Sequence, residues 1–116
     1  MSQLLGVLTL DRAIALFERP GSWTQIYYGR FHGLFGVEAT SKWATRWCLD
    51  GGLEVAALQV VHNPEGAKHA LEEARQLIYG YTGMKQHPGS LWDWNDEYGR
   101  TREEVVDLLK GAREAA

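Results

Sequence analysis

The sequence predicts a mostly α-helical fold, a single small domain of about four helices with one long irregular loop. Three observations lead to this prediction: one long apolar pattern with helical spacing, two clear helix start signals, and a length of 116 residues without a visible repeat or linker. We therefore expect residues 1–116 to form one domain whose core needs no disulfide or metal to fold.

The first predicted helix begins near Thr9, a plausible N-cap, and ends before Pro20-Gly21. Its apolar residues recur at helical spacing on one face: Leu10, Ala13, Ile14 and Phe17. Residues 22–39 are rich in glycine and aromatic residues without a sustained period. We expect a long ordered loop there, with room for a short strand pair, and loops of this length often carry function.

A second helix is expected to begin near Thr40 or Ser41, and its shared face holds Trp43, Ala44, Trp47 and Cys48. Asp50-Gly51-Gly52 leave its end open, because these residues can break a helix. Residues 53–61 fit a strand rich in valine and leucine, or a helix whose neighbouring glycines let another helix approach closely. We prefer the helix.

The third helix has the clearest signals, since Asn63 can cap it and Pro64 suits its first position. Its apolar face holds Ala67, Ala70, Leu71, Ala74, Leu77, Ile78 and Tyr81, and Gly80 and Gly83 end it. We expect a connecting loop over 84–90 and an extended segment over 91–94. The last helix starts at a capping box of Thr101 and Glu104, and its buried stripe is Val105, Leu108, Leu109 and Ala112.

Charge and cysteine usage narrow the classes of function. The net charge of −3 comes from mixed residues without a basic stripe, which argues against nucleic acid as a partner. The single cysteine forms no internal disulfide, the first ten residues lack a secretion signal, and no apolar run approaches the roughly 20 residues of a membrane span. We expect a cytoplasmic protein that is not in a membrane. The five tryptophans favour core packing over a contact surface.

Three short motifs stand out: Trp23-Thr24-Gln25, Arg46-Trp47-Cys48-Leu49-x-Gly51, and Trp94-Asn95-Asp96 followed by Arg100-Thr101. Together they resemble an uncharacterised family of small bacterial and phage proteins, a domain of unknown function. The chain departs from that family's pattern at Glu97-Tyr98, where a proline is common. The resemblance spans most of the chain and implies no activity.

The last motif has two interpretations. Asn95 and Asp96 suit a tight turn in which their side chains bond to nearby backbone amides, with Trp94 anchoring the turn and Arg100 holding a carboxylate or a helix carbonyl. Alternatively, carboxylate, amide and guanidinium together grip a polar ligand. We favour the turn and take as candidate binding residues Trp23, Gln25, Trp47, Trp94, Asn95, Asp96 and Arg100.

Catalytic and metal chemistry have weaker signals. Cys48 could act as a nucleophile with one of His32, His62, His69 or His87, but a cysteine inside a helix on its aromatic face is ordinarily buried and inert. His62, Glu65 and His69 form an incomplete metal shell, and no phosphate-binding glycine motif is present. We expect no catalytic residue, metal or cofactor.

The sequence therefore favours a small binding module whose partner is another protein, such as a phage or bacterial accessory protein that binds a host defence component. Two alternatives stay open. One is a small enzyme with a site around Cys48 or Asp93 and Asp96, and the other is a homodimer that joins through tryptophans. The partner and the oligomeric state are not encoded in any pattern of this sequence.

Overall fold

A computed structural model describes residues 3–26, 29–31, 35–42 and 44–116 of the chain. The fold is mostly helical, as the sequence predicts, with five α-helices and three short strands in these ranges. In chain order the elements are α1 (Leu4–Glu18), β1 (Gly29–Phe31), β2 (Phe35–Val37), β3 (Arg46–Trp47), α2 (Leu49–Val60), α3 (Pro64–Thr82), α4 (Pro88–Asp96) and α5 (Arg102–Ala115).

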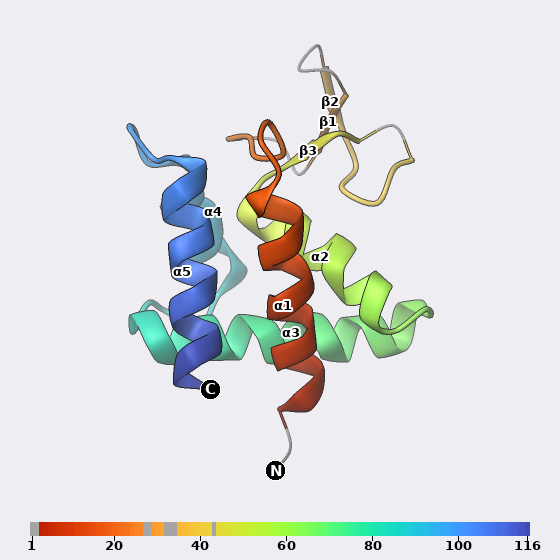
Figure 1. Cartoon of the computed structure of the whole chain (residues 1–116), viewed down its shortest axis with the longest axis vertical. Helices are drawn as coiled ribbons and strands as arrows, with labels where there is room; N and C mark the ends of the chain where they lie inside the picture. The colour runs from red at the N-terminus through yellow and green to blue at the C-terminus, as the bar shows by residue number, and fades with distance from the viewer. Residues whose placement is uncertain (1–2, 27–28, 32–34, 43) are drawn as a thin grey trace.

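The helices form a bundle with the strands at one end (Figure 1). Helices α1 and α5 run side by side, α3 crosses behind them near both chain termini, and α2 lies on the other side of α1. The strands form a small antiparallel sheet in the order β2-β1-β3. The strand pair that the sequence allows within residues 22–39 is therefore present as β1 and β2.

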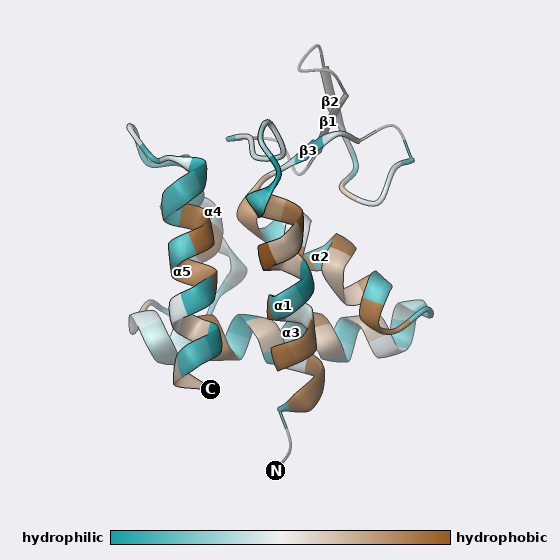
Figure 2. Ribbon diagram, viewed as in Figure 1, coloured by the Kyte–Doolittle hydropathy of each residue, from teal (hydrophilic) through white to brown (hydrophobic). Residues whose placement is uncertain are grey.

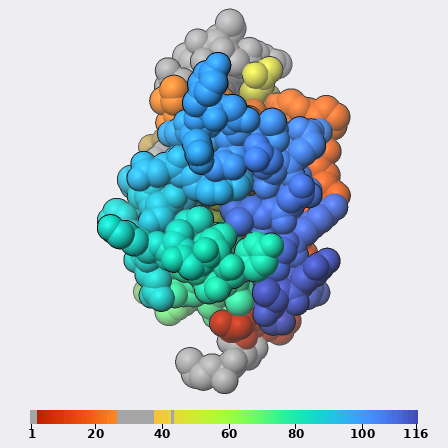
Figure 3. Space-filling view, turned by 90° about the vertical axis from the view of Figure 1, so that its left-hand side faces the viewer, coloured from red at the N-terminus to blue at the C-terminus, as the bar shows by residue number. Residues whose placement is uncertain are grey.

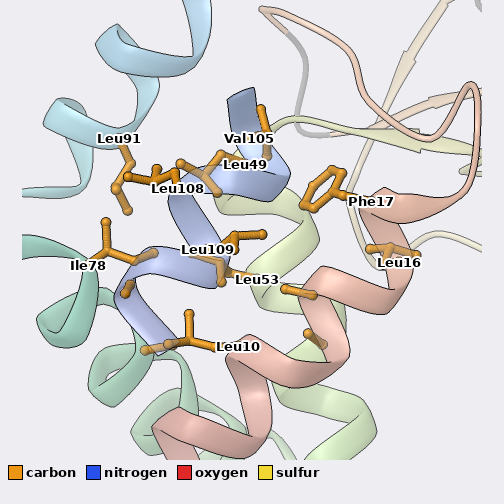
Figure 4. Packing of buried hydrophobic residues seen from close by; sticks show 14 of the residues in the cluster. Leu10, Leu16, Phe17, Leu49, Leu53, Ile78, Leu91, Val105, Leu108 and Leu109 are labelled. Atoms are coloured by element: carbon orange, nitrogen blue, oxygen red, sulfur yellow. The ribbon is translucent and has the colours of Figure 1, made fainter. Parts of the chain in front are cut away.

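One main hydrophobic cluster joins α1, α2, α3, α4 and α5. Figure 4 shows Leu10 and Phe17 of α1, Leu49 and Leu53 of α2, and Leu109 of α5 pointing into this shared space. Figure 2 shows hydrophobic and hydrophilic residues alternating along the helices, as expected of helices with one buried face. The predicted faces of the first, third and last helices are confirmed, because most of their apolar residues are buried in this cluster or in a smaller one between α2 and α3.

Helix α2 confirms the helical interpretation of residues 53–61, except that it ends at Val60. The glycines before them do not break the helix but lie in its first turn. A Cβ built on Gly52 would come within 2.2 Å of the Phe17 ring, so α1 and α2 can pack this closely only because residue 52 is glycine. The predicted close approach of another helix is therefore confirmed.

The prediction of a helix that begins near Thr40 or Ser41 is wrong. Residues 39–42 form turns, and Arg46–Trp47 form strand β3. The backbone N–H of Trp47 donates to Ser22 O at 2.8 Å, and Trp47 O accepts from Thr24 N–H at 3.0 Å. The backbone N–H and C=O groups that would bond within a helix are thus used for pairing with a distant segment. Trp43, which was expected on the face of this helix, lies outside the described residues.

The connecting loop expected over 84–90 is present only up to His87, and the extended segment expected over 91–94 is wrong, because α4 begins at Pro88. The His87 Nδ1 atom accepts from Gly89 N–H at 2.9 Å and caps the helix, and Pro88 occupies its first turn. This is the same start signal as Asn63 before Pro64, where the Asn63 side chain accepts from Gly66 N–H at 2.7 Å. The start of α4 was not predicted from the sequence because its capping residue is a histidine rather than one of the usual Ser, Thr, Asp or Asn.

The remaining boundaries follow ordinary capping chemistry. Helix α1 begins at Leu4 rather than after Thr9, whose hydroxyl donates to Leu5 O at 2.7 Å inside the helix. Helix α3 ends at Gly83, which has the left-handed φ of 76° that favours glycine. The capping box of α5 is present as predicted, with Thr101 and Glu104 bonded to each other's backbone N–H.

A pair of glycine substitutions tests the packing of α1 on α2. We expect Gly52→Ala to lower the free energy of unfolding by about 1–3 kcal/mol or more, because the added methyl group overlaps the fully buried Phe17 ring. The Cβ added by Gly80→Ala, in α3, meets no atom within 4 Å, so this change should raise the free energy of unfolding by about 0.5–1 kcal/mol. Urea denaturation measures both, and equal effects of the two variants would contradict the packing.

Candidate functional site

The side-chain amide of Asn95 is the centre of the candidate site. Asn95 lies in the last turn of α4 and is only 1% exposed. Its Oδ1 accepts from Trp23 Nε1 at 2.7 Å and from Leu49 N–H at 2.9 Å. Its Nδ2 donates to Thr24 O at 3.2 Å and to Asp96 Oδ1 at 3.0 Å. An asparagine side chain can make four such bonds, so this buried amide is fully satisfied.

Gln25 and Asp96 extend the same contact between the segment at 22–26 and the end of α4. Gln25 Nε2 donates to Asn95 O at 3.0 Å and to Glu97 O at 2.9 Å, which supplies a donor to the open carbonyl end of the helix. Asp96 Oδ1 accepts from the backbone N–H of Ile26 at 2.7 Å. The first and last sequence motifs therefore bind each other across 70 to 72 residues of chain.

Trp94 and Arg100 form a second unit on the same turn. The Arg100 guanidinium lies 3.9 Å from the Trp94 ring centroid, and its Nε donates to Trp94 O at 2.9 Å. Its other nitrogens pair with Glu97 and with Glu104 at the start of α5. Arg100 thus holds both a helix carbonyl and carboxylates, the structural role that sequence inspection favours for it.

Trp47 and Cys48, which belong to the middle motif, lie next to these contacts. Trp47 is buried, and its Nε1 donates to Ala39 O at 2.8 Å rather than to Asn95. Cys48 lies at the N-cap of α2, not inside a helix, and its Sγ accepts from Gly51 N–H at 3.3 Å. Burial is the main cause that raises the pKa of the thiol to about 11, and the nearby carboxylates of Asp50 and Asp96 add to the effect.

We call these contacts the Asn95 junction, defined by Trp23, Gln25, Leu49, Asn95 and Asp96. Of the seven candidate binding residues, it brings together Trp23, Gln25, Asn95 and Asp96. Trp94 and Arg100 lie on the same turn and contact each other, while Trp47 joins only through its backbone bonds to Ser22 and Thr24.

Ile26 has a strained backbone beside this junction. Its φ of 76° is in the left-handed region, which a β-branched residue adopts at a cost of about 1–3 kcal/mol. The side chain is 78% exposed, so burial does not offset the cost. The bond from Ile26 N–H to Asp96 Oδ1 holds the residue in this conformation.

A small pocket of about 170 Å³ opens between Ile26 and the end of α4. Its walls are Ile26, Cys48, Trp92, Asn95 and Asp96. Trp92 is 41% exposed although its Nε1 donates to Asp50 Oδ2 at 3.3 Å. The pocket therefore has an apolar wall, an indole wall and a carboxylate on one rim.

Behind the pocket lies an ion pair that sequence inspection did not find. Asp50 is 2% exposed, and its two carboxylate oxygens accept from Arg75 Nε at 2.9 Å and Nη2 at 2.7 Å. Burial alone would lower the pKa of Arg75, but the bonds and charge of Asp50 outweigh it and raise the pKa. The only sequence signal was Asp50 in the first turn of a helix, where a carboxylate is favoured by the helix dipole.

Of the residues considered for catalysis or metal binding, Cys48 and Asp96 line this pocket, and none of the described histidines does. His87 caps α4, while His62 precedes α3 and His69 lies within it; His32 lies outside the described residues. In the part of the chain that the structure describes, no three histidine, cysteine or acidic side chains are placed to hold a metal ion. Asp93 and Asp96 are both exposed on α4, and only Asp96 lines the pocket beside Cys48.

Two asparagine variants compare the junction with an ordinary helix cap. Asn95→Ala should lower the free energy of unfolding by roughly 3 kcal/mol or more, because it leaves Leu49 N–H and Thr24 O buried without partners. Asn63→Ala removes one exposed capping bond and should cost only about 1 kcal/mol. Thermal or urea unfolding measures both, and a smaller loss for Asn95→Ala than for Asn63→Ala would contradict the role of the junction.

The raised pKa of Cys48 predicts slow alkylation of the folded protein. Compared with the ordinary thiol pKa of 9.0, a pKa of about 11 leaves about a hundredfold less thiolate near neutral pH. Iodoacetamide at pH 7.5 should therefore modify the folded chain at least that much more slowly than the urea-unfolded chain, as followed by mass spectrometry. Rapid modification of the folded chain would indicate an activated thiol instead.

Comparison with known proteins supports the resemblance seen in the motifs. Neither the curated proteins nor the solved structures contain a match to the chain. Within the described residues, every helix is too short or too polar to cross a membrane. A family model matches residues 2–115, nearly the whole chain, and that model is described as a family of unknown function. The chain therefore belongs to the family of unknown function DUF6197.

Proposed function

We propose that this chain is a binding module that recognises another protein through the surface beside the Asn95 junction. We call this surface the junction face and define it by Ile26, Trp92, Asp96 and Tyr98. All four residues are exposed, and the last lies in the turn between α4 and α5. That turn projects from the body of the molecule (Figures 1 and 3).

The strained backbone of Ile26 is the observation that carries this proposal. A large apolar side chain is held outward in solvent, in a conformation that glycine would adopt more easily. In the part of the chain that the structure describes, the Ile26 side chain gains little from burial, and its left-handed backbone favours glycine over isoleucine. Strain that persists because surrounding contacts enforce it is typical of recognition sites, where the conformation is preorganised for a partner.

The composition of the junction face supports the same function. Exposed aromatic and aliphatic side chains with a satisfied polar rim are typical of protein interfaces. Trp92 is fixed by its bond to Asp50, so little conformational entropy would be lost when a partner covers it. The junction beneath is rigid, because its buried polar groups are bonded across three segments of the chain.

A larger apolar groove of about 760 Å³ runs between α2 and α3, but it indicates a partner less clearly. Its floor includes Ala57, Ala67 and Leu71. Its rim has charges of both signs, including Lys68 and Glu72, and so favours neither a basic nor an acidic partner. No strained backbone accompanies it among the described residues.

The other roles considered from the sequence draw less support from these contacts. An enzyme with Cys48 as nucleophile would need a thiolate, and burial opposes its formation. Among the four tryptophans that the structure describes, a homodimer would use Trp92, since Trp23, Trp47 and Trp94 are largely enclosed. An accessory role in a phage or bacterium, including binding to a host defence component, is part of the proposal and rests on the small size and tryptophan content.

Site-specific photocrosslinking in cells that naturally produce the chain tests the proposal. Benzoylphenylalanine replaces Tyr98, which is fully exposed on the junction face, or Tyr81, which is half exposed in the last turn of α3. Both changes exchange one aromatic side chain for another. We expect a discrete adduct to a second protein from position 98 and none from position 81.

Three results would contradict the proposal: no adduct from position 98, equal adducts from both positions, or an adduct of twice the chain's own mass. The last result would instead support a homodimer. Ile26→Gly supplies a further comparison in the same experiment. It should weaken the adduct from position 98 and at the same time raise the free energy of unfolding by about 1 kcal/mol, because it relieves the strain.

A further inference from the structure

We infer that the pocket of the junction face receives a basic side chain, a lysine or an arginine, from the partner protein. The inference rests on the proposed function and names the chemistry that the partner must present. Its starting observation is the juxtaposition of Ile26, Trp92 and Asp96 around one cavity of about 170 Å³.

The size of the pocket fits an alkyl chain that ends in a cation. The volume of about 170 Å³ is many times the roughly 10–15 Å³ that a single water needs, so the five non-hydrogen atoms of a lysine side chain have room to enter. Ile26 supplies an apolar wall for the methylene groups. The indole of Trp92 is the aromatic group that attracts cations best.

The charge of the pocket also fits a cation. Asp96 binds Ile26 N–H and the Asn95 amide through the same oxygen, Oδ1, and its Oδ2 has no partner among the described residues. The pocket also lies at the end of α4, where the helix dipole is negative. Both features favour a positive group near Asp96.

Two cations near this turn are already neutralised. Arg75 is paired with Asp50, and Arg100 is paired with Glu97 and Glu104 while it stacks on Trp94. The positive end of α2 points to this region, but its Leu49 N–H is bonded to Asn95 Oδ1 and its first turn contains the Asp50 carboxylate. Among the described residues that line the pocket, Asp96 therefore carries an unpaired charge.

Small probes test the inference without the partner. Butylammonium matches a lysine side chain, propylguanidinium matches an arginine side chain, 1-butanol is the neutral isostere, and butyrate has the opposite charge. NMR shifts of Ile26 N–H and Trp92 Nε1–H report on binding. We expect saturable millimolar binding of at least one cation, because so few atoms make few contacts, and at least tenfold weaker binding of butanol and butyrate.

Two charge variants provide the matched comparison. Asp96→Asn removes the charge but keeps an oxygen for Ile26 N–H, and it should weaken cation binding at least tenfold. Glu97→Gln removes one charge from the neighbouring residue, which does not line the pocket, and should leave binding unchanged. Equal losses in both variants, equal binding of butanol, or no saturable shift up to about 100 mM of either cation would overturn the inference.

The two experiments separate the inference from the proposed function. If the chain crosslinks a partner from position 98 but neither cation binds, the junction face recognises a partner by other chemistry and the inference is wrong. If a cation binds in the pocket but no adduct forms, the inference about the pocket stands and the proposed function is wrong.

Discussion

The architecture at the strand end of this molecule depends on one buried amide. Asn95 satisfies both its oxygen and its nitrogen with groups from the 22–26 segment, the start of α2 and its own helix. Two of these partners, Leu49 N–H and Thr24 O, are buried polar groups that would be costly to leave alone. The amide therefore fixes where α4 ends, where α2 begins and how the chain between α1 and the sheet crosses them.

This constraint changes the meaning of the sequence motifs. Trp23-Thr24-Gln25, Trp47-Cys48-Leu49 and Trp94-Asn95-Asp96 are far apart along the chain, but all of them contribute to the Asn95 junction or flank it. Their polar groups are mostly bonded to one another and not directed at solvent. The motifs describe a scaffold, and the features that suggest recognition lie next to it, at Ile26 and Trp92.

Local chemistry explains which elements were predictable. Helices α3 and α5 combine a strong apolar period with side-chain caps. Both features depend only on residues close together in the sequence, so they can be recognised without knowledge of the tertiary structure. Strand β3 was unpredictable, because its apparent helical face of Trp47 and Cys48 is overruled by backbone bonds to Ser22 and Thr24. Helix α4 was missed because its period is short and its cap is a histidine.

The candidate site was predictable in its membership but not in its geometry. The motifs singled out Asn95, Asp96, Trp23 and Gln25, which the structure brings into contact, since polar residues between tryptophans are unusual enough to notice. No sequence pattern reveals that Ile26 is left-handed and exposed, or that Asp50 and Arg75 meet between α2 and α3. Both features arise from tertiary contacts across 25 or more residues, as the Asp50–Arg75 separation shows.

Hydrogen exchange of side-chain amides tests the role of the Asn95 junction most directly. NMR can follow the Nδ2 protons of Asn95 and of Asn63, an exposed cap at the start of α3, in the same sample. If the junction is as rigid as its bonds imply, the Asn95 protons exchange only when the whole protein unfolds, while those of Asn63 exchange at nearly the rate of a free peptide. Exchange of the Asn95 protons as fast as those of Asn63 would contradict this rigidity.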